Sequence, residues 1–305
     1  MTGIAGRHDR AAWVLLVAHG VATLFGTLAL VTFLADSTPP AWLLTAQSQQ
    51  IMHWSFRVTG PAVVVLGFLA AALHAGGRVG WKAALGALGL GSIVALASEL
   101  TGTSTGYPFG DYAYTPLLGY RILGLVPFPI PVSWAFMLYC SLAMVGRLLP
   151  ARDSWRDRLG WAMLAGLFLT AWDVSMDPAM VRTNHWVWRT NGPFYGMPFS
   201  NWAGWYLTGV IVSLVMLAFM RPSIIARQVS PGAFPLWLYA VNGILPIAVC
   251  LRYGMTGAAI LGTIAMAIPL VLAARSPSRA EATRPENILT ATQPSSRQGS
   301  LPARA

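Results

Sequence analysis

The run LGWAMLAGLFLTAWDVSMD at residues 159–177 is about as long as a helix that crosses a bilayer, and it carries two aspartates near its end. The composition of the whole chain also indicates lipid as its solvent. Hydrophobic residues make up 55% of the chain and charged residues only 10%, whereas soluble domains carry about 25% charged residues. A soluble fold of 305 residues would leave too much of this apolar surface in water. The sequence therefore predicts an integral membrane protein.

Seven further apolar runs have a similar length. They lie at 11–35, 58–75, 82–100, 129–149, 202–220, 234–251 and 255–274. The first run is too long for the core of a signal peptide, so we expect it to be a retained helix. The break before the last run, Arg252-Tyr253-Gly254, is short. We predict an all-α fold, a polytopic membrane bundle of about eight transmembrane helices with two structured outer loops.

The basic residues indicate how this bundle is oriented. With the N-terminus inside, five basic residues fall in outer segments and the other 15 of the 20 fall in inner segments. Because cytoplasmic loops carry an excess of Lys and Arg, we expect a multi-pass protein of the cell membrane with cytoplasmic N- and C-termini. The charges are spread between apolar runs, so the net charge of +10 does not indicate nucleic-acid binding. We expect a transmembrane catalytic domain over 1–275 and a disordered cytoplasmic tail over 276–305.

Two long outer segments, 101–128 and 178–201, are rich in Gly, Pro and aromatic residues. Loops of this length in compact proteins are usually functional or disordered, and so many aromatic residues argue against disorder. The segments also resemble each other, because GYPFGDY at 106–112 is similar to GMPFSNW at 196–202. Two predicted helices separate the copies, so both face the same side. We interpret the similarity as a weak parallel internal repeat with a shared site between the copies.

Most acidic residues fall in the termini or inner connections, where water solvates them. Four do not, and these are Glu99, Asp111, Asp173 and Asp177. A carboxyl group in a membrane helix is costly unless it faces the protein interior, so it is a functional candidate. Asp173 and Asp177 are spaced i, i+4 and share one helix face. Two carboxyl groups in one low-dielectric site repel each other, so one of them tends to keep its proton. A protonated carboxyl group is what general acid catalysis requires.

Structural explanations compete with these functional ones. Asp177 precedes Pro178 and would then only end the helix, and Asp111 stands in a Gly-Asp-Tyr turn. Glu99 would lie at the membrane interface. Asp173, inside its apolar run, has the poorest structural explanation.

Aromatic residues crowd the same outer face. An aromatic belt at the headgroup level accounts for about half of them, and the others would line a pocket or stabilise a developing cation. The candidate substrate-binding residues are Tyr107, Tyr112, Tyr114, Trp172, Trp186, Trp188, Tyr195, Asn201 and Trp202. Trp205 and Tyr206 belong to the same aromatic group.

The sequence contains no nucleotide loop, haem motif, zinc set or flavin fingerprint. Cys140 and Cys250 lie inside apolar runs, which is typical of packed thiols. We interpret His53 and His185, both on the outer side, as structural. We expect neither a metal nor a cofactor.

A set of short motifs carries a resemblance to a known family. They are ELTGT at 99–103, TGYPFGDY at 105–112, Tyr114-Thr115, Trp172-Asp173 and Asp177-Pro178. Together they resemble the integral-membrane carotenoid 1,2-hydratases, which include gamma-carotene hydratases and bisanhydrobacterioruberin hydratases, over roughly residues 55–275. The resemblance implies addition of water across the terminal 1,2 double bond of an acyclic carotenoid end, of the lycopene or gamma-carotene type. The product would be a tertiary alcohol, formed without a cofactor.

Such a reaction needs a strong acid, a group that orients and deprotonates water, and electron-rich walls around a tertiary cation. We expect Asp173 or Asp177 to be the acid, and Glu99 or Asp111 to hold the water. The carotenoid would stay in the bilayer while its end meets water near the interface. Other enzymes of carotenoid biosynthesis are candidate partners.

Three other functions fit parts of the pattern. A carotenoid end-cyclase would use the same proton and the same cation and then close a ring. A membrane prenyltransferase is suggested by DVSMD at 173–177, but it needs basic residues for a diphosphate, and only Arg182 and Arg189 are close in sequence. A proton-coupled transporter also contains buried acids, which it usually places near the membrane midplane.

Overall fold

The computed structural model describes residues 4–33 and 41–276. The expected disordered tail therefore lies almost wholly outside the described residues, as does the side chain of His53. Within them, eight helices are long and apolar enough to cross a membrane, which confirms the all-α polytopic bundle. The spans are Gly6–Thr32, Ala46–Val79, Trp81–Thr105, Pro129–Leu148, Trp155–Arg182, Ser200–Phe219, Phe234–Arg252 and Thr256–Arg275.

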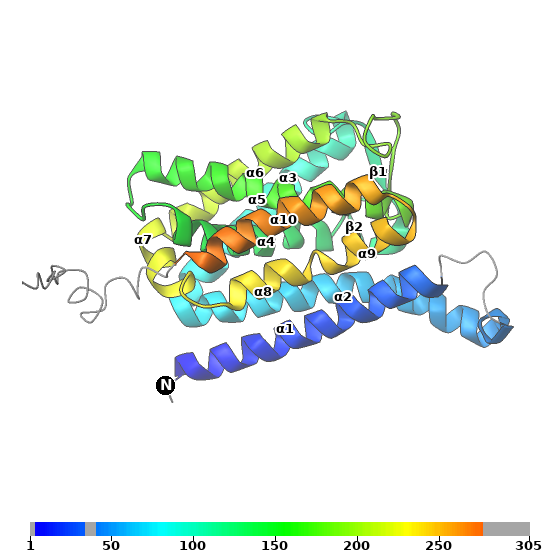
Figure 1. Cartoon of the computed structure of the whole chain (residues 1–305), viewed down its shortest axis with the longest axis horizontal. Coiled ribbons are helices and arrows are strands. Elements are labelled where there is room, and N and C mark those ends of the chain that lie inside the picture. The colour runs from blue at the N-terminus through cyan, green and yellow to red at the C-terminus, as the bar shows by residue number, and fades with distance from the viewer. Residues whose placement is uncertain (1–3, 34–40, 277–305) are drawn as a thin grey trace, which may run out of the picture.

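The helices follow one another up and down the bundle (Figure 1). The α-helices are α1 (Ile4–Leu28), α2 (Ala46–Val79), α3 (Trp81–Thr105), α4 (Pro129–Leu148), α5 (Trp155–Arg182), α6 (Ser200–Phe219), α7 (Pro222–Ile224), α8 (Phe234–Val241), α9 (Ile244–Arg252) and α10 (Thr256–Arg275). The other helical segments are η1 (Ala29–Phe33), η2 (Ala41–Leu44), η3 (Pro116–Leu118) and η4 (Ile225–Val229). The strands are β1 (Tyr112–Tyr114), β2 (Arg121–Ile122), β3 (Val126–Pro127) and β4 (Trp186–Trp188).

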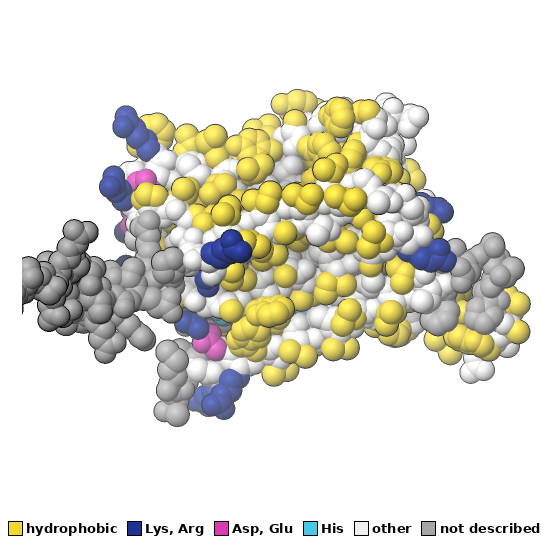
Figure 2. Space-filling view, viewed as in Figure 1, with side chains coloured by type: hydrophobic (Ala, Val, Ile, Leu, Met, Phe, Trp, Pro, Cys, Tyr) yellow, Lys and Arg dark blue, Asp and Glu magenta, His cyan; other side chains and the backbone are white. Residues whose placement is uncertain are grey.

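Helix α4 is the central helix of the bundle. Of its most apolar window, 89% is buried inside the protein, against 28% for the span of α1. The other helices surround α4 and turn apolar side chains outward, and Figure 2 shows hydrophobic side chains over most of the visible face, with Lys and Arg gathered toward its two ends. Since lipid is as apolar as these side chains, their exposure is typical of a membrane-facing surface.

Helix α5 starts and stops at specific local signals. Ser154 caps it by accepting a hydrogen bond from the backbone N–H of Asp157 at 3.2 Å. The helix does not end at Asp177, because it continues through Pro178 as far as Arg182. Both outer segments therefore begin later than the sequence suggested, since α3 likewise continues to Thr105.

The seventh span is broken in the middle. Helix α8 ends at Val241 and α9 begins at Ile244, with Asn242 and Gly243 between them. The indole N–H of Trp172 donates to the carbonyl of Asn242 at 2.9 Å. Breaks of this kind are tolerated in a membrane where the freed backbone groups find partners inside the protein.

The two outer segments meet in an antiparallel ribbon made of β1 and β4. Tyr112 pairs with Trp188, Ala113 with Val187, and Tyr114 with Trp186. Successive side chains of a strand point to opposite faces, so the four aromatic residues share one face of the ribbon. The outer loops are thus structured, and strand pairing joins them at the end of the bundle opposite the N-terminus (Figure 1).

The two segments of the expected repeat, 106–112 and 196–202, do not occupy equivalent positions in the fold. The first segment runs from the end of α3 to the start of β1, whereas the second leads into α6. A better match is Pro127-Phe128 before α4 with Pro198-Phe199 before α6, because Phe128 and Phe199 both stand at the helix N-cap. Six residues further on, Trp134 and Trp205 stack with their ring centroids 4.3 Å apart. The two helix starts thus share a Pro-Phe pair and a Trp at the same spacing.

The turn before α6 leaves no room for a side chain at Gly192. A Cβ atom added there would lie 2.1 Å from the backbone carbon of Met197. We expect Gly192→Ala to lower the melting temperature in detergent, because overpacking costs about 1–3 kcal/mol or more. Gly160→Ala in α5 is the matched control, since no atom lies within 4 Å of the added Cβ. Equal melting temperatures for the two variants would contradict the close approach at Gly192.

Candidate active site

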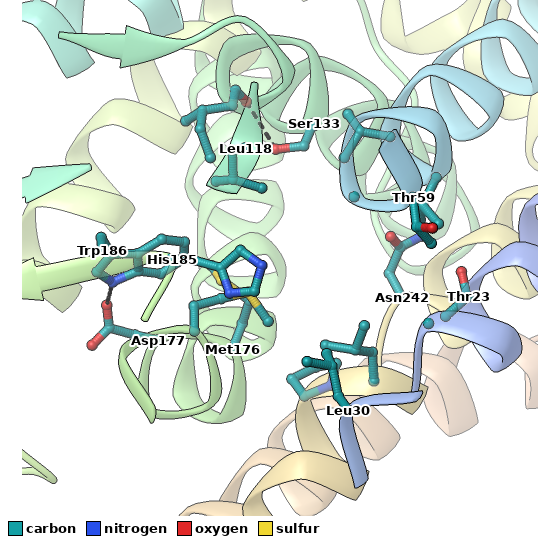
Figure 3. Close-up of a pocket in the computed structure, with 18 of the residues that line it drawn as sticks. Thr23, Leu30, Thr59, Leu118, Ser133, Met176, Asp177, His185, Trp186 and Asn242 are labelled. Carbon is teal, nitrogen blue, oxygen red and sulfur yellow. Dashed lines mark hydrogen bonds between the residues drawn. The ribbon is translucent and has the colours of Figure 1, made fainter. Parts of the chain in front are cut away.

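A cavity of about 480 Å³ lies between the outer ribbon and the membrane helices. Figure 3 shows Asp177, His185 and Trp186 on one side of this space, and Thr23, Thr59 and Asn242 on the other. The first wall comes from β1, β4 and α5, and the second comes from α1, α2 and the break between α8 and α9. Most of the lining is apolar, so the few polar groups that reach the cavity are conspicuous.

Asp177 is one of two carboxyl groups in the lining, and its side chain is rigidly held. Its Oδ1 accepts a hydrogen bond from the indole N–H of Trp186 at 2.7 Å, and its Oδ2 accepts one from Trp188 at 3.0 Å. The residue is only 2% exposed. An indole N–H can only donate, so each oxygen of Asp177 acts as an acceptor and keeps a further lone pair.

Glu99 is the other carboxyl group in the lining and has more donors. Its Oε2 accepts hydrogen bonds from Tyr112 at 2.5 Å and Tyr114 at 2.8 Å, and its Oε1 accepts one from the indole of Trp134 at 3.1 Å. Burial and the charge of Glu99 raise the pKa of both tyrosine hydroxyl groups well above the ordinary value. The tyrosines therefore stay neutral and donate, and three donors converge on one carboxylate.

The ribbon connects the two carboxyl groups through an aromatic layer. The rings of Tyr112 and Trp188 are 5.2 Å apart, those of Tyr114 and Trp186 are 5.8 Å apart, and the two tyrosine rings are 5.4 Å apart. The tyrosines of one outer segment bind Glu99, and the tryptophans of the other bind Asp177. Each outer segment thus fixes the acid of the helix that precedes it.

Asp173 lies one turn before Asp177 but is not part of the cavity lining. It is fully buried, and its Oδ2 accepts a hydrogen bond from the side-chain amide of Asn201 at 2.8 Å. Its Oδ1 is buried and has no hydrogen-bond partner among the described residues. Asn201 itself reaches the cavity and so connects Asp173 with it.

Besides Asp173, four of the sequence candidates do not line the cavity. Asp111 forms a surface ion pair with Arg189 at 3.2 Å, and its side chain is 48% exposed. Tyr107 is 68% exposed, and the hydroxyl of Tyr195 accepts a hydrogen bond from the backbone N–H of Gly257. Trp202 packs against neighbouring aromatic rings of its own segment. Asp111 is thus a surface residue that pairs with Arg189 and does not line the cavity.

Several site residues were not predicted from the sequence as parts of the site. Trp134 binds Glu99, and Ser133 and Asn242 line the cavity. Trp205, which the sequence analysis placed in the aromatic group, also lines the cavity and stacks on Trp134. A repeated Pro-Phe before α4 and α6, with a Trp at the same distance after each, is the signal that would have found Trp134. His185 also lines the cavity, whereas it was expected to be structural.

Within residues 4–33 and 41–276, no group of three or more His, Cys, Asp or Glu side chains is arranged to hold a metal ion. Cys140 and Cys250 are both buried free thiols, as expected. The chemistry available in the cavity is that of carboxyl groups, an imidazole, hydroxyl groups and aromatic rings.

Comparison with known proteins identifies the family. Residues 59–269, which include both carboxyl groups, the ribbon and the helices α3 to α6, match the family described as carotenoid biosynthesis protein. The chain belongs to this carotenoid biosynthesis family. A relative in the archaeon Haloarcula japonica, named bisanhydrobacterioruberin hydratase, is 34% identical over 117 residues.

The alignment with this relative spans 38% of the chain and 39% of the hydratase. No solved structure matches the chain. Membership of the carotenoid biosynthesis family indicates a carotenoid-modifying role, and this role agrees with a cavity that is lined mostly by apolar side chains, many of them from membrane helices.

Proposed function

We propose that the protein is a carotenoid 1,2-hydratase, which adds water across the terminal 1,2 double bond of an acyclic carotenoid end and forms a tertiary alcohol. The observation that carries the proposal is the pair of carboxyl groups, Glu99 and Asp177, fixed on one aromatic ribbon at a largely apolar cavity. The proposed reaction needs an acid and a stabilised cation in an apolar site. The name of the archaeal relative supports this choice of reaction.

Asp177 is the proposed proton donor. Unlike Asp173, it lines the cavity, so it can reach a bound alkene. Both of its oxygens already accept from indole N–H groups, so a proton on Asp177 must use the remaining lone pairs, away from the two tryptophans. A second acid one turn earlier, Asp173, favours a proton shared between the pair. Transfer of that proton to C2 of the terminal double bond leaves a tertiary cation at C1.

Glu99 is the proposed counter-charge for the cation. Three donors converge on it, so it is well suited to remain an anion when the proton moves. Trp134, Trp205 and the ribbon rings add electron-rich faces, which attract a cation electrostatically. Because these groups are fixed before the reaction, they cost little reorganisation when the charge develops.

The position of the cavity suits a substrate dissolved in lipid. Its second wall is built from α1 and α2, which form the outermost layer of the bundle in Figure 1. The carotenoid end would enter between membrane helices while the remaining polyene stays in the bilayer. Pockets of this volume are typical of small-molecule sites, so the cavity would hold the reacting end and not the whole chain.

The prenyltransferase alternative is weaker in this geometry. Arg182 stacks over the ring of Tyr253 with its guanidinium carbon 4.2 Å from the ring centroid, and Arg189 pairs with Asp111 at the surface. Neither arginine lines the cavity, so neither is placed to bind a diphosphate there.

Expression in a lycopene-producing host tests the proposed reaction. Mass analysis of the extracted pigments should show a gain of one water per modified end. An isomer of unchanged mass would instead indicate cyclisation, and unchanged lycopene from a well-expressed protein would contradict action on this substrate. The same assay with a gamma-carotene-producing host defines which acyclic end is accepted.

We also propose that residues 1–275 form the catalytic membrane domain and that both termini face the cytoplasm. The positive-inside bias supports this orientation, and Figure 1 places the N-terminus and the α4–α5 connection at the end opposite β1. Reporter fusions after Arg10 and near Asp153 should report the cytoplasmic side, and a fusion near Arg189 should report the other side. An outer location for Asp153 would contradict the orientation.

A further inference from the structure

His185 occupies a position that the end of α5 fixes tightly. Its backbone N–H donates to the carbonyl of Met180 at 2.9 Å, and the N–H of Asn184 donates to Val181 at 3.0 Å. Asn184 has a φ of 63°, the left-handed conformation that commonly ends a helix in this pattern. The carbonyl of His185 then accepts from the N–H of Thr115 on the other outer segment at 3.0 Å. Both outer segments therefore hold this residue in place.

The hydrogen bonds of Thr183 favour one of the two neutral tautomers of His185. The hydroxyl of Thr183 donates to the carbonyl of Ala179 at 2.8 Å, as a carbonyl can only accept. The same hydroxyl oxygen lies 2.8 Å from Nδ1 of His185, so it accepts from an Nδ1–H group. The neutral tautomer with its proton on Nδ1 leaves a free lone pair on Nε2.

That lone pair is available to a molecule in the cavity. His185 lines the cavity, and its ring projects into the space beside Met176 and Asp177 in Figure 3. No partner for Nε2 is found among the residues that the structure describes. Burial lowers the pKa of His185 to about 4, so the ring is neutral near pH 7.

We propose that His185 is the catalytic base of the hydration, with Nε2 holding the attacking water and accepting its proton. This assignment rests on the proposed function and names a residue for its second half-reaction. Asp177 gives its proton to C2, the π bond breaks, and C1 becomes the cation. The water oxygen then forms a bond to C1, and the O–H bond that breaks leaves its proton on Nε2. Transfer of this proton from the imidazolium to the Asp177 carboxylate, directly or through water, restores the starting state.

A neutral imidazole is a suitable base for this step. The oxonium ion formed when water adds to a tertiary cation is a very strong acid, so even a weak base takes its proton. Glu99 and Asp177 already accept hydrogen bonds from aromatic side chains, whereas Nε2 of His185 has no hydrogen-bond partner in the described part of the chain. The proposed acid, Asp177, and the proposed base, His185, are thus separate residues on the same wall of the cavity (Figure 3).

Deuterium exchange separates the two half-reactions. In D₂O, transfer of a deuteron from Asp177 gives a cation that carries one H and one D at C2. Rotation about the C1–C2 bond, followed by loss of the H to the Asp177 carboxylate, leaves unhydrated carotenoid labelled at C2 without any use of His185. We expect His185→Phe to lower hydration by at least about 100-fold while this labelling stays close to that of the parent protein. His8→Phe is the control, because His8 packs edge-on against Trp81 and does not line the cavity.

The possible outcomes are distinct. Retained hydration in His185→Phe, or a parallel loss of hydration and labelling at normal membrane levels, would overturn the assignment of the base. A parent protein that neither hydrates nor labels the carotenoid would overturn the proposed function itself, and with it this inference. Loss of hydration with labelling retained supports both.

Thr183 provides a second variant that leaves the imidazole in place. Thr183→Val removes the hydroxyl that fixes the tautomer, and we expect hydration to fall about tenfold, the scale of one hydrogen bond. Thr183→Ser keeps the hydroxyl and should restore hydration, with labelling unchanged in both variants. If the Val and Ser variants hydrate equally well, the tautomer of His185 has no role in the reaction, and the proposed base fails.

Discussion

Asp177→Asn is expected to reach normal membrane levels and to lose hydration by at least about 100-fold, the usual scale of general acid catalysis. The amide keeps the size of the side chain and one acceptor for the indole groups of Trp186 and Trp188, but it has no transferable proton. Deuterium labelling at C2 should disappear together with hydration, because both need the first proton transfer. Mass analysis of the carotenoids in H₂O and D₂O measures the two effects in one experiment.

Asp173→Asn is the matched control for this variant. Asp173 is buried behind the cavity wall, and an amide oxygen can still accept from Asn201. We expect a smaller loss, because the change removes only the neighbouring acid and leaves the proton donor in place. A larger loss for Asp173→Asn than for Asp177→Asn would assign the acid to Asp173 instead.

Glu99→Gln is expected to lower both hydration and labelling by at least about 100-fold, the scale reported for removing a preorganised electrostatic group. Gln removes the negative charge, yet the packing can persist, because tyrosine hydroxyl groups can accept from an amide as well as donate. The cation at C1 then lacks its counter-charge, so its formation slows. The ratio of labelling to hydration should stay unchanged, in contrast to the His185 variant.

Two further changes bracket this prediction. Tyr114→Phe removes one of three donors to Glu99 and should cost less than Glu99→Gln, since a hydrogen bond to a charged group contributes about 1.5–3 kcal/mol. Asp111→Asn should have no measurable effect, because an exposed ion pair contributes about 0–1 kcal/mol and lies outside the cavity. Full activity of Glu99→Gln would remove Glu99 from the mechanism.

The acidic residues show which parts of the site can be predicted from the sequence. A carboxyl group in an apolar run costs free energy if it faces lipid, which predicts that Glu99, Asp173 and Asp177 face the protein interior. All three are buried. The same reasoning grouped Asp111 with them, because a loop residue has no apolar run to show which way it faces. Its pairing with Arg189 depends on how two distant loops approach each other, and the sequence contains no local signal for that.

The pairing of β1 with β4 could not be predicted from local sequence. YAY at 112–114 and WVW at 186–188 alternate with the period of a strand, but each is only three residues long. A strand this short is stable only with a partner, and here the partner lies on the other outer segment. The prediction of a repeat was wrong for the same reason. The similar sequences at 106–112 and 196–202 occupy different positions in the fold, the first between α3 and β1 and the second at the start of α6.

Composition and periodicity alone predict that this protein lies in lipid, that it has about eight spans and that its aromatic residues gather at one end of the bundle, and the eight spans are confirmed. These properties follow from the transfer of each segment between water and lipid, which depends on local composition. The packing of distant segments places Asp177 in the lining of the cavity and Asp173 behind it, and it brings the ring of His185 into the same lining. Those choices depend on hydrogen bonds between residues far apart in the chain, and such bonds form only when the helices and outer segments have packed together.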